Sequence, residues 1–421
     1  MTDDQGILAV RKMICAAILA LLLLTSACAE HTRDGIRMAY RNISDWAGGS
    51  PYLEAPAVTA PYAPGALTDA ALGDALHYLN FIRWLAGLEP VKGSEIYNYQ
   101  CQHGAVLLAA LDYVDHSAPN PGDMDKNFYE SAHLATTSSN IARFNWMRES
   151  IIREGIAYFV RDDGDQNLPT MGHRRWALNP AMGATGFGLA NAASGMSYVV
   201  MYAHDLGNAD ARWDCVRWPA AGAFPAELMH DHLAWTVTLN PAVYDLEASA
   251  PAVTLEEPDL GLRFDFDLAE EAGDGFCAVN LEPYGAGGCV IFRPDFTGTG
   301  FTDYQQNQHW RVRVGGLVTR AGDAATLDYT VDMVALRAED AVNVEISQLE
   351  AALRPGETLQ LSAQVIPSYA DDLRVTWLSS DPAVASVDET GRVTAVGPGA
   401  CDIVCADCAG HTDACRVSVA E

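Results

Sequence analysis

The chain has 421 residues, of which 49% are hydrophobic, and this is enough apolar material for about three ordinary domains. Acidic residues outnumber basic residues by 55 to 26, so the formal net charge is −29. A chain this acidic repels phosphate backbones and anionic lipid headgroups, which argues against nucleic acid as a partner.

The first 29 residues have the pattern of an export signal. Arg11 and Lys12 precede an apolar run, Met13–Leu24, that is shorter than the ~20 residues needed to span a bilayer. Residues 27–29 fit a small-x-small peptidase site, whereas residues 24–28 form an imperfect lipoprotein box ending at Cys28. Both alternatives predict a secreted or cell-envelope protein, with membrane contact only through the signal region or a lipid on Cys28.

Eight of the ten cysteines lie beyond this segment, and an exported chain with an even number permits disulfides. Cys277 and Cys289 flank a glycine-rich turn and could pair locally. Cys405 and Cys408 have the spacing of a zinc motif, but no second such pair follows, so disulfides suit this cluster better. The cluster consists of Cys401, Cys405, Cys408 and Cys415.

The rest of the chain divides by pattern into four segments. Residues 30–65 are rich in Ala, Pro and Gly, which predicts a linker or wrapping arm. Residues 66–214 begin with helical periodicity from Thr68, continue with helices at about 94–114 and 146–160, and end with strand-like runs at 185–189 and 197–203. Residues 215–340 alternate in short apolar runs, which predicts a β-sandwich-like region.

Residues 341–421 also alternate at period two, and they carry specific motifs. Trp377-Leu-Ser-Ser-Asp381 and Gly391-Arg-Val-Thr-Ala395 resemble the motifs of bacterial immunoglobulin-like domains. The resemblance implies a β-sandwich in which Trp377 fills the core and Gly391 and Gly397 supply turns. Such modules usually act as spacers or adhesive stalks.

Three motifs in the helical region carry a second resemblance: His116-Ser-Ala-Pro119, Ser138-Ser-Asn-Ile-Ala142 and Met171-Gly-His-Arg-Arg-Trp176. In this order they resemble the bacterial branch of the CAP superfamily (cysteine-rich secretory, antigen five and pathogenesis-related proteins), over Ala66 to Asp214. The resemblance implies an α-β-α sandwich in which two distant histidines share one cleft. The expected fold class is therefore multi-domain α+β, a CAP-like α-β-α sandwich followed by two all-β sandwich-like domains.

Carried over by position, the resemblance places His116 and His173 in the cleft. The first family acid precedes Asn-Ile, where this chain has Ser139 before Asn140, and the second acid matches Asp162. Some family members bind zinc, so His116, His173 and Asp162 are the candidate ligands for a divalent metal such as zinc. The serine weakens that expectation because a hydroxyl does not replace a carboxylate ligand.

Other interpretations stay open at this stage. The two histidines could be purely structural, or Ser139 could join a Ser-His-Asp triad, although no Gly-x-Ser-x-Gly turn supports one. Arg174 and Arg175 are expected to pair with carboxylates, and residues 162–167 suit a solvated helix end better than a calcium loop. His230 and His232 look like two ligands on one strand face without a third.

The leading hypothesis is an exported cell-surface or secreted binding or adhesion protein, with a cleft around His116 and His173. Its ligand is an extracellular molecule or cell-envelope component that the sequence does not identify. The alternative is a metal-assisted hydrolase acting on peptide or cell-wall material, and a purely structural wall protein is a third. The acid lost at Ser139 favours binding over catalysis.

Overall fold

The computed structural model describes residues 31–43, 48–145, 150–268, 275–337, 340–368 and 370–420. These residues form two compact units. Unit 1 comprises the chain to Tyr304 and Gln308–Met333, and unit 2 comprises Gln305–Asn307 and the chain from Val334 onward. The signal peptide expected over residues 1–29, with its lipid site at Cys28, lies outside the described residues, as does Trp146. Among the described residues no helix is long and apolar enough to cross a membrane.

Two long helices of unit 1 begin where the sequence places their caps. The Thr68 side chain accepts a hydrogen bond from Ala71 N at the start of α3, Asp69–Leu85, and Ser94 does the same for Tyr97 N at the start of α4, Glu95–Leu111. Helix α4 ends three residues earlier than expected, because Asp112 takes the left-handed conformation at φ 58°.

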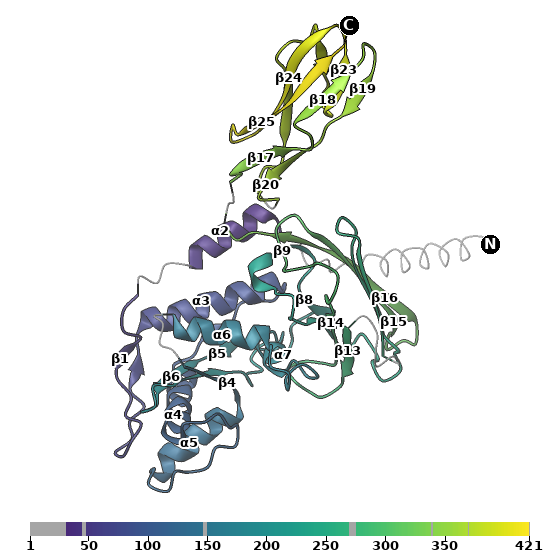
Figure 1. The fold of residues 1–421 in the computed structure, drawn as a ribbon. Helices are drawn as coiled ribbons and strands as arrows, with labels where there is room; N and C mark the ends of the chain where they lie inside the picture. The colour runs from purple at the N-terminus through teal and green to yellow at the C-terminus, as the bar shows by residue number, and fades with distance from the viewer. Residues whose placement is uncertain are drawn as a thin grey trace, which may run out of the picture. The chain divides into compact units, whose positions relative to one another are not determined.

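A three-stranded antiparallel sheet in the order β4-β7-β6 lies beside these helices (Figure 1). Its strands are Ser139–Phe144 (β4), Phe187–Asn191 (β6) and Ser197–Tyr202 (β7). On one face, a Cβ at Gly188 would lie 2.1 Å from the Cys101 carbonyl oxygen of α4. On the other face, a Cβ at Gly155 of α6, Ile151–Arg161, would lie 2.6 Å from Val199 Cγ1. Glycines therefore let helices approach both faces of the sheet.

Several elements of unit 1 differ from the expectation. The segment expected to be irregular contains α2, Arg33–Ile43, and strand β1, Tyr52–Glu54, which pairs with β2, Ala66–Leu67. Helix α5, Lys126–Thr137, was not predicted, and neither was the short helix α7, Gly172–Ala177. Two further short strands, Lys92–Gly93 (β3) and Ala184–Thr185 (β5), pair in parallel.

The remainder of unit 1 is β-structure in two sheets, of order β13-β14-β10-β8 and β12-β11-β15-β16-β9. Trp235 and Trp310 are fully buried between them, with ring centroids 6.0 Å apart. The strands are Cys215–Trp218 (β8), Gly222–Pro225 (β9), Trp235–Leu239 (β10), Ala252–Glu257 (β11), Leu262–Asp267 (β12), Gly275–Asn280 (β13), Cys289–Pro294 (β14), His309–Val318 (β15) and Ala324–Val334 (β16); a 3-10 turn, Ala226–Leu228, follows β9.

Unit 2 is all β-structure, with sheets of order β18-β25-β24-β21 and β19-β23-β22 and the pair β17-β20. Trp377 is partly buried and packs against the core of this unit, and Gly391 turns at φ 80°. The strands are Asn343–Ile346 (β17), Glu350–Leu353 (β18), Thr358–Gln360 (β19), Ala363–Ile366 (β20), Val375–Ser379 (β21), Ala385–Val387 (β22), Arg392–Ala395 (β23), Gly399–Asp407 (β24) and Thr412–Val419 (β25).

Cys277 and Cys289, which could have paired locally, are not joined to each other by a disulfide, because strand register separates the two residues. Cys289 lies opposite Asn280, three residues and thus roughly 10 Å along β13 from Cys277, and an odd offset points the side chains to opposite faces. In unit 2, Cys405 is a buried thiol and Cys408 an exposed one, and neither belongs to a group of three potential metal ligands among the described residues. Cys401 and Cys415 are also buried thiols, so the structure contains none of the disulfides expected in this cluster.

Candidate functional site

A carboxylate–imidazole pair lies where α6 meets α7. Asp162 follows the last residue of α6 in the left-handed conformation, at φ 52°, and its side chain is buried. Its Oδ1 accepts a hydrogen bond from His173 Nδ1 at 2.8 Å, and its Oδ2 accepts one from Arg174 N at 3.3 Å. The carboxylate therefore fixes both the start of α7 and the orientation of the His173 ring.

His116 reaches the same place from the loop after α4. Its Nδ1 donates to the Thr136 carbonyl oxygen at 2.8 Å, and the Thr136 hydroxyl donates back to the His116 carbonyl oxygen at 3.0 Å. The ring centroids of His116 and His173 lie 6.4 Å apart. Because Nδ1 of each ring faces a protein acceptor, Nε2 of each ring is left for another partner.

His204, which the sequence analysis missed, belongs to the same cluster. Its ring packs on Trp176 of α7 with centroids 4.1 Å apart, and its backbone follows β7 next to Ser138. Partial burial and the charge of nearby His116 both lower the pKa of His204. The position of His204 at the end of the predicted strand 197–203 was the only local signal for it.

His116 and His204 help to line an open cleft of about 400 Å³, whereas His173 and Asp162, which were also expected in the cleft, are not among its lining residues. The cleft combines imidazoles, two aromatic rings and one carboxylate, a mixture suited to a polar ligand with an apolar part. Its lining residues are His116, Thr137, Trp176, His204, Glu282, Pro283 and Tyr284.

Ser139 and Asn140 lie behind the cleft rather than in it. Ser139 is buried, and its hydroxyl lies 3.9 Å from Cys101 Sγ of α4, a contact that does not activate a nucleophile. Asn140 is buried and its Nδ2 donates to the His173 carbonyl oxygen at 2.8 Å. Asn140 therefore positions α7, and the geometry gives no support to a triad through Ser139.

The expected metal ligands do not form a three-ligand set. Asp162 is bound to Nδ1 of His173, so it orients that ring instead of sharing an ion with its Nε2. Two Zn–N bonds in a tetrahedral site would bring imidazole centroids to roughly 5 Å, which is shorter than the separation of His116 and His173. Among the described residues no three His, Cys, Asp or Glu side chains are arranged to hold a metal ion. The donors present therefore do not fit zinc.

Arg174 and Arg175 are buried structural residues, and the expectation that they pair with carboxylates is wrong. Arg174 donates to the carbonyl oxygens of Val160, Arg161 and Ala234 at 2.6–2.8 Å. Arg175 donates to three backbone carbonyl oxygens and to Asn280 Oδ1 at 2.6–3.1 Å. Backbone carbonyls left over at helix and loop ends take up most of the guanidinium donors, as burial favours, although Nε of Arg175 is buried without a hydrogen-bond partner.

The remaining sequence candidates are dispersed. Asp163 beside the end of α6 lies 3.8 Å from the Arg161 guanidinium, as expected for a solvated helix end. His230 and His232 lie in a turn rather than on a strand, with rings stacked at 5.8 Å. Their Nδ1 atoms contact two different carboxylates, those of Asp303 and Asp231.

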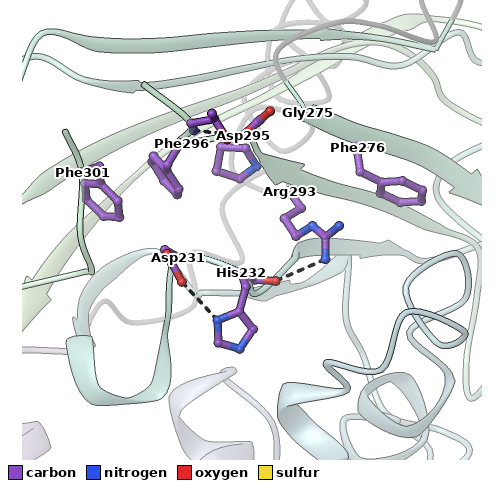
Figure 2. A pocket seen from close by; sticks show the side chains of 10 residues that line it. Asp231, His232, Gly275, Phe276, Arg293, Asp295, Phe296 and Phe301 are labelled. Atoms are coloured by element: carbon purple, nitrogen blue, oxygen red, sulfur yellow. Dashed lines mark hydrogen bonds and ion pairs between the residues drawn. The ribbon is translucent and has the colours of Figure 1, made fainter. Parts of the chain in front are cut away.

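A second and larger cavity, of about 770 Å³, opens beside β13 and β14 (Figure 2). Phe296 and Phe301 stack there at 4.0 Å, and Arg293 donates to the His232 carbonyl oxygen at 3.5 Å. Charges of both signs, from Arg293, Asp231 and Asp295, share its lining, so no ligand charge is favoured. No sequence motif marks this cavity, because its residues come from three separate segments.

Residues 340–415 match the family described as bacterial Ig-like domain, group 2, and the chain therefore carries such a domain. The match agrees with the motifs around Trp377 and Gly391. The whole chain is multi-domain, predominantly strand with some helices.

Two curated proteins are similar over short stretches. The chain is 43% identical over 70 residues to a lacto-N-biosidase of Bifidobacterium bifidum and 42% identical over 74 residues to a 3-O-alpha-D-galactosyl-alpha-L-arabinofuranosidase of Bifidobacterium longum subsp. longum. Each match covers 17% of this chain and 6% of the relative, so the chain spans only a small part of either relative's length.

Solved structures with local similarity include two surface proteins. One is a C-terminal intimin fragment in complex with the intimin-binding domain of its receptor Tir (17% identity, 50% of this chain, 64% of that chain, TM-score 0.15). The other is the N-terminal part of the bacterial S-layer protein SbsC (10% identity, 45% of this chain, 41% of that chain, TM-score 0.18). Scores this low do not support an argument about the whole fold.

Proposed function

We propose that this chain is an exported cell-surface or secreted binding protein whose helical region, residues 66–214, is a CAP-like domain with its ligand site at the histidine cleft. A bacterial Ig-like domain fits a cell-surface or extracellular protein. Helices on both faces of the β4-β7-β6 sheet are consistent with the CAP-like arrangement.

One observation supports the ligand site above all. His116 and His204 come from separate segments and both line one open cleft, and the His116 ring is held by a protein acceptor at Nδ1. His173 does not line the cleft, and its ring centroid lies 6.4 Å from that of His116. The conformational entropy of a ring held in one orientation is lost on folding. A ligand that contacts the free edge of such an imidazole does not have to order the ring again on binding.

The alternative of a metal-assisted hydrolase has less support, because the donors near the cleft do not fit a zinc site and Ser139 is no nucleophile. His173 is nevertheless oriented by Asp162 near His116, and a hydrolase would have to release products. Product formation therefore separates the two classes.

The test uses the purified chain on an array of immobilised cell-envelope glycans and peptides. We expect binding to a subset of the array that is lost when both His116 and His204 are replaced by alanine. The matched control is His309→Ala, because His309 is exposed on β15 and pairs with Asp332 outside the cleft. Binding that survives the double replacement contradicts the cleft site, and cleavage of array ligands would favour the hydrolase.

A further inference from the structure

One wall of the histidine cleft comes from a distant part of the chain. Glu282, Pro283 and Tyr284 lie in the loop between β13 and β14, 78 residues or more after the cleft histidines His116 and His204. A ligand in the cleft therefore contacts both the helical region and the β-region of unit 1.

This loop is fixed in place by Arg175 of α7. The guanidinium donates to the carbonyl oxygens of Glu282 and Gly287 and to Asn280 Oδ1, at 2.6–2.7 Å, and it lies 5.3 Å from the centre of the Tyr284 ring. Hydrogen bonds from a charged, buried donor are strong and geometrically specific. The loop is thus a preformed wall.

Two glycines allow this close contact. A Cβ at Gly172 would lie 3.1 Å from the Tyr284 ring, and a Cβ at Gly285 would lie 2.5 Å from the Arg175 carbonyl oxygen. Gly285 also has φ +68°, a conformation that other residues rarely adopt. The loop and α7 are therefore shaped for each other along the cleft.

The charge of the lining is one-sided. Glu282 is the one acidic residue among the described lining residues, and the lining contains neither Lys nor Arg. Its carboxylate makes no ion pair with a described Lys, Arg or His side chain. Burial and hydrogen bonding to Glu282 raise the pKa of Tyr284, so the phenol stays protonated and can donate to that carboxylate.

The other charged groups near the cleft do not reverse this sign. The positive charge of Arg175, which does not line the cleft, interacts with Glu282, and Asp162 adds a further negative charge at His173. The net charge of −29 strengthens the negative potential over the whole surface. Trp176 and Tyr284 add aromatic rings, which attract cations through their faces.

We infer that the cleft binds a ligand carrying a positively charged ammonium or guanidinium group, held by the Glu282 carboxylate beside Trp176 and Tyr284. The inference rests on the proposed function, because it assigns a ligand class to the same cleft. It adds that the β-region supplies the residue that determines specificity.

The test compares two peptides that differ by one charge, acetyl-Ala-Lys-Ala-amide and acetyl-Ala-norleucine-Ala-amide. Binding to the purified chain is measured by saturation-transfer NMR at low and high salt. We expect the lysine peptide to bind about fivefold to 30-fold more tightly, and the difference to shrink in high salt.

Glu282→Gln removes the charge while preserving shape, and it should abolish the preference for lysine. Glu389→Gln is the matched control, because it removes the same charge from an exposed site in unit 2. Equal binding of the two peptides, or no binding of the lysine peptide at roughly 10 mM, overturns this inference.

Failure of the inference and failure of the proposed function give different patterns. If the norleucine peptide binds as well as the lysine peptide and the His116/His204 double replacement abolishes both, the cleft site stands and the cationic class is wrong. If peptide binding is unaffected by the double replacement and by Glu282→Gln, both are wrong.

Discussion

Replacing Arg174 with methionine should destabilise unit 1 more than any other single arginine loss that we consider. Arg174 is fully buried, and its guanidinium satisfies the carbonyl oxygens of Val160 and Arg161 at the end of α6 and of Ala234 before β10. Methionine fills most of the volume but donates no hydrogen bond, so three buried acceptors lose their partner.

The expected cost follows from two opposing effects. Hydrogen bonds from a charged donor contribute about 1.5–3 kcal/mol each. Burial lowers the pKa of Arg174 to about 10, so removing the charge returns about 3 kcal/mol of desolvation. We therefore expect the free energy of unfolding of unit 1 to fall by about 2–5 kcal/mol.

Urea unfolding, followed by the fluorescence of the buried Trp218, Trp235 and Trp310, measures this loss. Arg313→Met is the control, because Arg313 forms an exposed pair with Asp328 and should cost at most about 1 kcal/mol. Arg174→Lys should fall between the two variants, since one ammonium cannot reach all three carbonyls. A loss for Arg174→Met no larger than that for Arg313→Met would refute the role given to these hydrogen bonds.

Three further outcomes are expected. Gly188→Ala should lower the melting temperature markedly, because its Cβ would lie 2.1 Å from a backbone oxygen of α4. Gly73→Ala, with nothing within 4 Å of its Cβ, should instead raise stability by about 0.5–1 kcal/mol. Similar effects of the two variants in thermal unfolding would contradict the close packing at Gly188. Burial lowers the pKa of His103, so the free energy of unfolding should fall as the pH drops below about 6.5. In urea titrations, the His103→Gln variant should lose less of this free energy between pH 7 and pH 5 than the unchanged protein. Parallel pH dependences of the two proteins would argue against a role for His103. A thiol reagent should label the exposed Cys408 in the native protein. The buried thiols of unit 2, Cys401, Cys405 and Cys415, should be labelled only after unfolding, as mass spectrometry can show. Labelling of these three thiols in the native protein would contradict their burial.

The helix starts at Thr68 and Ser94 could be predicted because capping is local: a side chain satisfies a backbone N–H three residues away. Helix α5 was missed because small residues fill its contact with α4, where a Cβ at Gly104 would lie 2.9 Å from Ala135 Cβ. Small residues give little apolar periodicity, so such a helix has a weak signal.

The residues of the candidate site were likewise only partly predictable from the sequence. The resemblance pointed to His116 and His173, and the structure places their rings 6.4 Å apart. The only local signal for His204 is its position after the predicted strand 197–203, and nothing near Glu282 marks that residue, because each reaches the cleft through tertiary packing. The role of Arg175 was also largely non-local, since three of its four acceptors lie more than a hundred residues away.

In unit 2, β18 pairs in parallel with β25, from Glu350 opposite Arg416 to Leu353 opposite Val419. A pull applied upstream of β18 and downstream of β25 would load the hydrogen bonds between these strands in shear, so they would have to break together and not one after another. Mechanical lifetime depends on the unfolding rate and not on the free energy alone. This pairing therefore equips the unit to withstand tension.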